Sequence, residues 1–338
     1  MTQLHLTRTL PHGGQLRRAA TEYGIPLTDW LDLSTGINPR PWPVPAAVTS
    51  YWSRLPEADD GLETAAAQYY GSDQLLPVAG SQAAIQALPH LRPPCRVGIL
   101  TPSYAEHQHA WALAGHQVLA LTVGELDAAV AAADLDVLLL IHPNNPSGAR
   151  FERAQLLNWH ESLARRGGWL VVDEAFMDVT PEQSLVTDLP RTGLIVLRSL
   201  GKFFGLAGAR VGFVFADDAT RQAVGEHLGP WTVASPARWV ATRALADRDW
   251  QITTRAWLPL AGERLAQVLT EQGLTPQGGC ALFQWVVTPA AAALHSHLAR
   301  AGILTRLFTT PAAVRFGLPN TAAEWQRLTA ALGQLTRN

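Results

Sequence analysis

The sequence predicts an α/β fold with a large domain, in which helices cover a mostly parallel sheet, and a smaller α/β domain after it. Apolar runs of strand length recur through the first two thirds of the chain, separated by helical or loop stretches. Their hydrophobicity is continuous rather than alternating, which indicates strands that are buried on both faces. After residue 235 the pattern changes to long helical stretches with short strand-like segments between them.

The composition fits a compact enzyme. Of the 338 residues, 47% are hydrophobic and 16% are charged, which argues against disorder. The net charge of −2 gives no electrostatic footprint for nucleic acid or an anionic membrane. Cys95 and Cys280 are the only cysteines, so neither a disulfide framework nor a zinc site is predicted. The chain shows no signal-peptide core and no apolar run of membrane-spanning length, so we expect a cytoplasmic protein.

Residues 1–45 predict an irregular arm with a short helical pattern over 15–22. His12-Gly13-Gly14 precedes that pattern, and Ser34-Thr-Gly-Ile-Asn38 leads into a segment dense in proline, which excludes a regular element there. Small residues with free backbone N–H groups suit an anion pocket. On composition alone, however, an ordinary turn-rich arm is the better interpretation.

The next segment predicts a strand, a glycine turn and a helix. A helix over 61–70 is followed by a strand from Leu76, the turn Gly80-Ser81 and a second helix over 83–88. Such a turn gathers N–H groups and the positive end of the helix dipole, as a phosphate cradle does, although ordinary helix caps look the same. Six further strands are expected: Val97–Leu100, Val118–Leu121, Val137–Ile141, Trp169–Asp173, Leu194–Ser199 and Val211–Ala216.

Lys202 follows one of these buried strands and is flanked by small residues. Burial lowers the pKa of a lysine toward neutrality, and a neutral amine can bond covalently to an aldehyde. Ser199 and Arg210 could bring a hydroxyl and a guanidinium to one phosphate. An aldehyde together with a phosphate points to pyridoxal 5'-phosphate (PLP). A surface lysine after a strand is the alternative, which this spacing and the upstream residues disfavour.

Other polar residues also stand at strand ends, where ligands of parallel sheets bind. Asp173 could pair with a protonated pyridine nitrogen or cap a helix. Asn145, in a proline-rich turn, could donate to a phenolate oxygen or serve only the turn. Tyr104 could stack on a ring or belong to the core.

The C-terminal part predicts a smaller α/β domain. Helical patterns over 239–272, 290–301 and from 322 alternate with strand-like segments over 281–287, 302–306 and 314–318. Two facing arginines, Arg306 and Arg315, would clamp an anionic substrate, although an arginine on a strand is usually a solvated edge residue. We therefore predict an arm over 1–45 that contributes to the substrate site, a cofactor domain over 46–235 and a small domain over 236–338.

Two histidine pairs, His107/His109 and His295/His297, lie in helical patterns. Histidines two positions apart point to different faces of a helix, so exposed or packing histidines are expected and no metal is assigned.

Taken in order and spacing, these residues resemble the fold-type I PLP-dependent enzymes of the class I/II aminotransferase group, from Leu33 to the terminal helix. The resemblance implies that Lys202 bonds covalently to PLP, that Asp173 pairs with its pyridine nitrogen, and that Tyr104 stacks on its face. It implies further cofactor contacts from Gly80, Ser81, Gln82, Asn145, Ser199 and Arg210.

Within this group the chain is most similar to the threonine-phosphate decarboxylase family of cobalamin biosynthesis, itself similar to histidinol-phosphate aminotransferases. The motifs at His12 and Asn38 carry this narrower resemblance, as does Phe176, where many aminotransferases have tyrosine. It implies decarboxylation of L-threonine O-3-phosphate to (R)-1-aminopropan-2-yl phosphate. The implied substrate residues are His12, Gly13, Asn38, Asn145, Arg306 and Arg315.

The sequence departs from the group at Leu55, where many relatives carry a tyrosine that reaches the cofactor phosphate across a homodimer. The family implies a homodimer, but this motif does not support one. Transamination, which breaks the Cα–H bond instead, remains an alternative reaction. The two reactions differ only by a rotation about one bond, which the spacing of residues does not resolve. A non-catalytic PLP-fold binding protein is a remote alternative. A regulator of that fold would need an N-terminal DNA-binding domain, and the leader is short and not basic.

Overall fold

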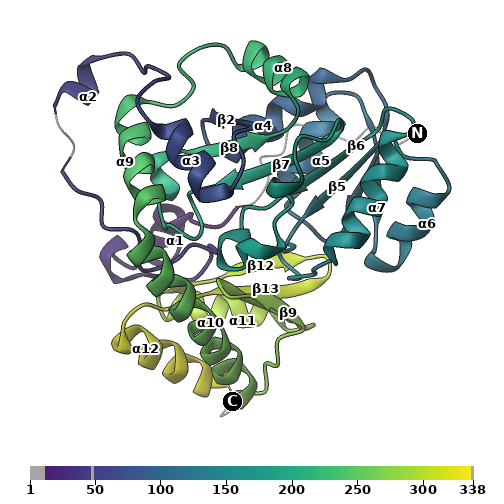
Figure 1. The fold of residues 1–338 in the computed structure, drawn as a ribbon. Helices are drawn as coiled ribbons and strands as arrows, with labels where there is room; N and C mark the ends of the chain where they lie inside the picture. Colours follow the sequence, from purple (N-terminus) through teal and green to yellow (C-terminus); the bar gives the residue numbers. More distant parts are fainter. Residues whose placement is uncertain (1–11, 47–48, 336–338) are drawn as a thin grey trace. The chain divides into compact units, whose positions relative to one another are not determined.

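The computed structural model describes residues 12–46 and 49–335, and Figure 1 shows its elements. The chain divides into two compact units. The cofactor unit, as we call it, contains residues 41–145 and 150–253. The leader unit contains the described residues up to Arg40, residues 146–149 and the chain from Thr254 on. Among the described residues, no helix is long and apolar enough to span a membrane.

A seven-stranded sheet forms the centre of the cofactor unit, and it confirms the predicted α/β fold (Figure 1). All neighbouring strands run parallel except around β8, which is antiparallel to both β7 and β2. No crossover helix separates β7 from β8, only residues 200–211 with a short 3₁₀ turn, so the chain returns antiparallel. The strand order is β2 (Leu75–Val78), β8 (Gly212–Phe215), β7 (Leu194–Ser199), β6 (Trp169–Asp173), β5 (Val137–Ile141), β3 (Arg96–Leu100) and β4 (Gln117–Leu121).

The inner strands of this sheet are buried on both faces, as the continuous apolar runs predict, whereas the edge strand β4 is partly exposed. All five residues of β5 are buried. Val137 and Leu139 of that strand pack in one apolar cluster with residues of α4 (Ser81–Ala87), α5 (Ala105–Leu113) and α8 (Asp218–Leu228). On β8 the rings of Phe213 and Phe215 instead contact Tyr70 of α3 (Leu62–Tyr70). The other helices of this unit are α2 (Ser50–Ser53), α6 (Leu126–Ala131), α7 (Arg153–Ala164) and α9 (Ser235–Ala246).

The leader unit contains a four-stranded antiparallel sheet in the order β12 (Arg306–Thr309), β13 (Ala312–Gly317), β10 (Phe283–Val287) and β9 (Gly278–Cys280). Its helices are α1 (Leu16–Tyr23), α11 (Ala291–Arg300) and α12 (Ala322–Gly333). The long helix α10 (Arg248–Glu271) begins in the cofactor unit and belongs to the leader unit from Thr254 on.

The leader is tied into this unit by backbone hydrogen bonds, although its described residues are irregular, as predicted, apart from α1, a 3₁₀ turn and a two-residue strand. Strand β1 (Leu31–Asp32) pairs in parallel with β11 (Ile303–Leu304). The N–H of Leu33 donates to the carbonyl of Leu304, and the N–H of Gly317 donates to the carbonyl of Leu33. Leu33 is fully buried. The pairing partners lie some 270 residues away in sequence, so local composition does not reveal them.

The three domains that the sequence predicts, with boundaries after residues 45 and 235, stay a prediction. The compact units are discontinuous in sequence, since the leader and the C-terminal part belong to the same one.

Candidate active site

Lys202 lies in the loop that follows β7, at the carboxyl end of the sheet. Its Nζ is 5.5 Å from the centre of the Phe176 ring. Phe176 comes three residues after Asp173, which ends the neighbouring parallel strand β6. The structure therefore brings the predicted lysine and the segment of the predicted carboxylate to one edge of the sheet.

Asp173 is held by two hydrogen bonds in a buried position. Its Oδ2 is 2.8 Å from Nε2 of His107, and its Oδ1 accepts the N–H of Ala175 at 3.0 Å. Asp173 is 3% exposed and His107 is 1% exposed. These contacts fix the orientation of a carboxylate that can face the ring nitrogen of a bound cofactor.

His107 is a site residue that the sequence analysis missed. Its spacing to His109 predicts only an exposed or packing histidine. The available signal was its place on the helix that starts directly after Tyr104, a predicted ring-stacking residue. The Tyr104 and His107 rings lie edge to face with their centres 6.2 Å apart.

The Gly80-Ser81 turn meets Arg210 and the end of β7, as a phosphate cradle requires. Gly80 has a φ of +73°, and a β-carbon there would lie 2.6 Å from Nη2 of Arg210. Ser199 pairs with Gly212, where a β-carbon would lie 2.5 Å from the backbone nitrogen of Ser81. The two glycines thus give the room in which serine and arginine donors converge.

Gln82 contacts residues that surround this cradle. The Tyr104 hydroxyl donates to Oε1 of Gln82 at 3.3 Å, and Nε2 of Gln82 donates to Glu106 at 2.9 Å. These bonds fix Tyr104 at the start of α5, and the predicted phosphate contact of Gln82 stays a prediction.

Asn145 lies half-buried in a turn that buried neighbours hold in place. The side chain of Asn144 donates to the carbonyl of Pro102 at 2.9 Å. The N–H of Phe151 donates to Nε2 of His142 at 3.0 Å. Burial, together with the charge of Arg150, lowers the pKa of His142 to about 4, so the ring is neutral at pH 7.

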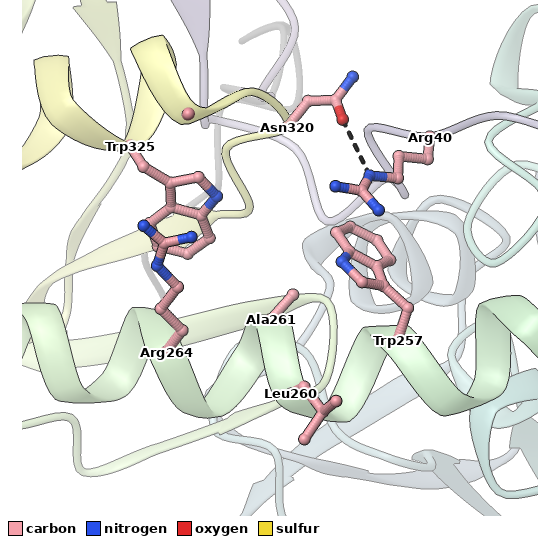
Figure 2. A pocket seen from close by; sticks show the side chains of 8 residues that line it. Arg40, Trp257, Leu260, Ala261, Arg264, Asn320 and Trp325 are labelled. Atoms are coloured by element: carbon pink, nitrogen blue, oxygen red, sulfur yellow. Dashed lines mark hydrogen bonds between the residues drawn. The ribbon is translucent and has the colours of Figure 1, made fainter.

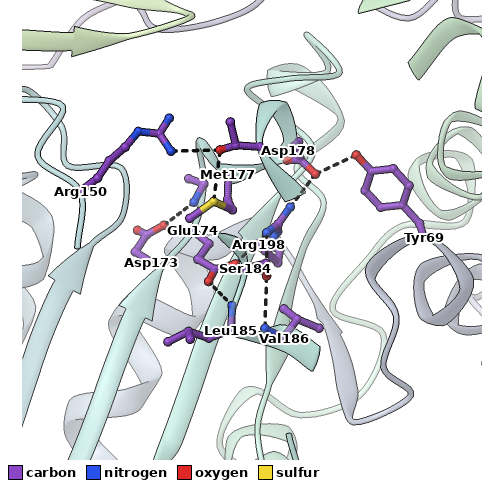
Figure 3. A network of polar contacts seen from close by, with 12 residues as sticks. Tyr69, Arg150, Asp173, Glu174, Met177, Asp178, Ser184, Leu185, Val186 and Arg198 are labelled. Carbon is purple, nitrogen blue, oxygen red and sulfur yellow. Dashed lines mark hydrogen bonds and ion pairs between the residues drawn. The ribbon is translucent and has the colours of Figure 1, made fainter. Parts of the chain in front are cut away.

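A buried ionic network joins Arg198 of β7 to Glu174, which directly follows β6, and to Asp178 (Figure 3). Arg198 donates to Glu174 and to Asp178, each at 2.7 Å. Ser184 and the N–H of Leu185 also donate to the Glu174 carboxylate. Burial raises the pKa of Glu174. Burial works against the charge of Arg198, but its two acidic neighbours outweigh that effect and raise its pKa.

In the leader unit, Arg306 and Arg315 lie directly opposite each other on β12 and β13. Arg315 is 7% exposed, and its Nη2 donates to the carbonyl of Ser34 at 2.8 Å. Like charges at opposed positions destabilise a strand pair. An anion bound beside both guanidiniums would remove this cost.

Ser34 connects Arg315 with the glycine motif of the leader. The N–H of Gly14 donates to Oγ of Ser34 at 2.7 Å, while Ser34 donates through its N–H and its hydroxyl to Asp32. A β-carbon at Gly13 would overlap the Ser34 carbonyl oxygen. Asp32 and Ser34 are not among the predicted site residues, since only the fold shows that Ser34 contacts Arg315 and Gly14 and that Asp32 accepts hydrogen bonds from Ser34.

Of the other predicted substrate residues, Asn38 and His12 belong to this unit as well, whereas Asn145 belongs to the cofactor unit. Asn38 is 1% exposed, and its side-chain oxygen accepts the N–H of Arg40 at 2.9 Å. His12 is half-buried beside Gly13.

These residues fit PLP. A buried oriented carboxylate, a glycine-lined cradle with an arginine, and a lysine at the same sheet edge match the pyridine nitrogen, the phosphate and the aldehyde of the cofactor.

Comparison with known proteins gives the family. Residues 49–334 match the model of the family "Aminotransferase class I and II". The chain is 58% identical, over 96% of its length and 97% of the relative's, to the threonine-phosphate decarboxylase of Pseudomonas aeruginosa. A threonine-phosphate decarboxylase of a Sinorhizobium species is 40% identical over 98% of this chain and 99% of the relative.

The histidinol-phosphate aminotransferase of Sinorhizobium meliloti, solved in complex with PLP, has the same fold. It superposes with a TM-score of 0.83 over 100% of this chain and 98% of that chain, at 20% sequence identity. The chain belongs to the aminotransferase class I and II family, whose members use pyridoxal 5'-phosphate.

Proposed function

We propose that this protein is a PLP-dependent lyase that decarboxylates L-threonine O-3-phosphate to (R)-1-aminopropan-2-yl phosphate, a step of cobalamin biosynthesis. The observation that carries the proposal is the 58% identity over 96% of the chain to a threonine-phosphate decarboxylase. The opposed Arg306 and Arg315 support it, because a substrate with a phosphate and a carboxylate supplies the anions that this pair favours.

The residues of the cofactor unit would bind PLP and handle protons. When bound, PLP supplies a ring that accepts electrons from a bond to the substrate's α-carbon. Asp173, oriented by His107, holds a proton at the ring nitrogen. Ser81, Ser199 and Arg210 hold the cofactor phosphate. Lys202 carries the covalent link and returns a proton to the substrate's α-carbon.

The residues of the leader unit would bind the substrate. Arg315, fixed by the Ser34 carbonyl, binds the carboxylate and sets its orientation. The orientation of the carboxylate would decide which bond to the α-carbon the cofactor activates, so Arg315 would select decarboxylation over loss of the α-proton. His12, Asn38 and Arg306 bind the substrate phosphate, whose binding energy is remote from the chemistry and helps to hold that orientation.

Incubation of the holoenzyme with phosphothreonine tests the proposal. We expect release of CO₂ without any keto-acid acceptor, while the cofactor stays in its aldehyde form. A histidinol-phosphate-type aminotransferase would instead convert the cofactor to its pyridoxamine form and release no CO₂, which would overturn the proposal. A Lys202→Ala protein that retained full function would favour a non-catalytic binding protein.

We also propose a cytoplasmic homodimer. Trp52 and Leu55 are 73% and 64% exposed, and such large apolar side chains at a protein surface favour a protein interface. Light scattering of the holoenzyme should give twice the chain mass, and a Trp52→Ser/Leu55→Ser variant should weaken the dimer. Cell fractionation tests the compartment.

A further inference from the structure

A cavity of about 370 Å³ opens in the leader unit, and none of its lining residues is one to which we assign a cofactor or substrate role (Figure 2). This volume lies within the range of small-molecule sites, about 300–1,000 Å³. Its walls come from α10, from the start of α12 and from the end of the leader. The lining residues are Arg40, Trp257, Leu260, Ala261, Arg264, Asn320, Ala322 and Trp325.

Two arginines of the cavity each place the guanidinium over a tryptophan ring. The Arg40 guanidinium is 4.1 Å from the ring centre of Trp257, and the Arg264 guanidinium is 4.3 Å from that of Trp325. Figure 2 shows the two pairs on facing sides of the pocket. Stacking occupies the face of a guanidinium and leaves its N–H groups at the edge, where they can bind a phosphate.

The position of Arg40 is fixed further by a hydrogen bond. Its Nε donates to the side-chain oxygen of Asn320 at 3.1 Å. The acidic side chain on this segment, Glu324, accepts the backbone N–H groups of Asn320 and Thr321 and so caps α12. Side chains that are held in place before a ligand arrives lose less entropy when it binds.

The cavity combines positive charge with apolar faces. Trp257, Ala261 and Arg264 lie on one side of α10, and the first and last are about 10 Å apart along the helix axis. The small Ala261 between them leaves room in the middle. Among the described residues that line the cavity, two are arginines and none is acidic. Inorganic phosphate alone would leave the indole faces unused.

We propose that this cavity binds an organic phosphate, with the phosphate between the N–H edges of Arg40 and Arg264 and a planar apolar body against the indoles of Trp257 and Trp325. The proposal does not depend on the reaction that the enzyme catalyses.

The test is a titration of the holoenzyme, labelled with 5-fluorotryptophan, with phenyl phosphate followed by ¹⁹F NMR. Trp→Phe variants assign the resonances of Trp257 and Trp325. We expect both resonances to shift saturably, and inorganic phosphate at equal ionic strength to bind at least about tenfold more weakly. Absence of a saturable shift, or equal binding of inorganic phosphate, would overturn the proposal.

Two double variants separate the cavity from other phosphate sites. Arg40→Gln/Arg264→Gln should weaken the binding by about tenfold or more, since each arginine gives a charge-assisted hydrogen bond. The control Arg17→Gln/Arg300→Gln removes the same charge from exposed positions of the same unit and should bind as the wild type does. Unchanged cofactor absorbance and melting temperature show that both variants fold. Shifts that persist in the cavity variant would contradict the proposal.

Discussion

His107 orients the carboxylate that we assign to the ring nitrogen of the cofactor. The substitution His107→Asn removes the 2.8 Å hydrogen bond between the histidine ring and Asp173. The hydrogen bond from the Ala175 N–H to the Asp173 carboxylate remains. A hydrogen bond to a charged group contributes about 1.5–3 kcal/mol, so we expect kcat/KM for CO₂ release to fall roughly ten- to hundredfold. His109→Asn, on the same helix, is the control and should keep the wild-type rate. Equal rates for both variants would contradict this role.

Gly13 is required because its backbone packs against Ser34. The β-carbon of Gly13→Ala would overlap the Ser34 carbonyl oxygen, which also accepts from Arg315. We expect KM for phosphothreonine to rise about tenfold or more, with PLP affinity unchanged. Gly124→Ala, where an added β-carbon meets open space, is the control. Steady-state kinetics and a cofactor titration measure both quantities, and an unchanged KM would refute the requirement.

His142 makes stability depend on pH. Its pKa is about 4 in the folded protein and near 6.5 when unfolded, so between these values only the unfolded state binds the proton. The neutral His142 ring therefore adds about 3 kcal/mol to the free energy of unfolding above pH 6.5, and this stabilisation is lost as the pH falls toward 4. His142→Gln, which keeps an acceptor for Phe151, should flatten this part of the stability curve in urea unfolding. If the free energies of unfolding of the wild type and the variant changed with pH in parallel, His142 would be excluded as the cause of the pH dependence.

Residues were predictable where their chemistry is local. Lys202, Asp173 and Ser199 each end or follow an apolar run, so their position at the sheet edge follows from the strand pattern. His107 and Ser34 act through single contacts with Asp173 and Arg315. Those contacts join residues 66 and 281 positions apart, and no local pattern encodes them.

Strands β6 and β7 carry Asp173 and Ser199, and the Arg198 network ties their ends together. Glu174→Gln keeps the side-chain shape but leaves Arg198 with one carboxylate fewer in a fully buried place. Breaking a buried ion pair costs about 3–5 kcal/mol, so we expect a loss of that size in urea unfolding. The exposed Glu182→Gln should cost less than about 0.5 kcal/mol. A Glu174 variant as stable as this control would show that the network does not hold the strands.

A strand could be predicted from the sequence where its consecutive residues are apolar, as they are when both faces of the strand are buried. Every strand of the central sheet was expected, because each one carries an apolar run, and the inner strands owe that run to burial on both faces. Strand β1 was not expected, because a two-residue strand has no periodicity and exists through its pairing with β11. The antiparallel direction of β8 likewise depends on how residues 200–211 fold, which hydrophobicity does not encode.

Over the whole chain, the residues assigned to the cofactor and those assigned to the substrate divide between the two units. Lys202, Asp173 and Arg210 belong to the cofactor unit, whereas His12 and Arg315 belong to the leader unit. This division does not follow the linear order of the sequence, since the leader folds with the C-terminal part through β1, β11 and the Gly317–Leu33 bond.

Because the proposed PLP contacts lie in one unit, PLP should stabilise the two units unequally. At 100 times its dissociation constant, a ligand that binds only the folded state adds about 2.7 kcal/mol. Amides of β6, β7 and β8 that exchange through opening of the cofactor unit should therefore exchange up to about 100-fold more slowly in the holoenzyme than in the apoprotein. Amides of β10 and β13 should change far less. Hydrogen exchange with mass spectrometry measures both sets, with Lys202→Ala as a control that loses the covalent link. Equal slowing in the two units would contradict the assignment of the cofactor to the cofactor unit alone.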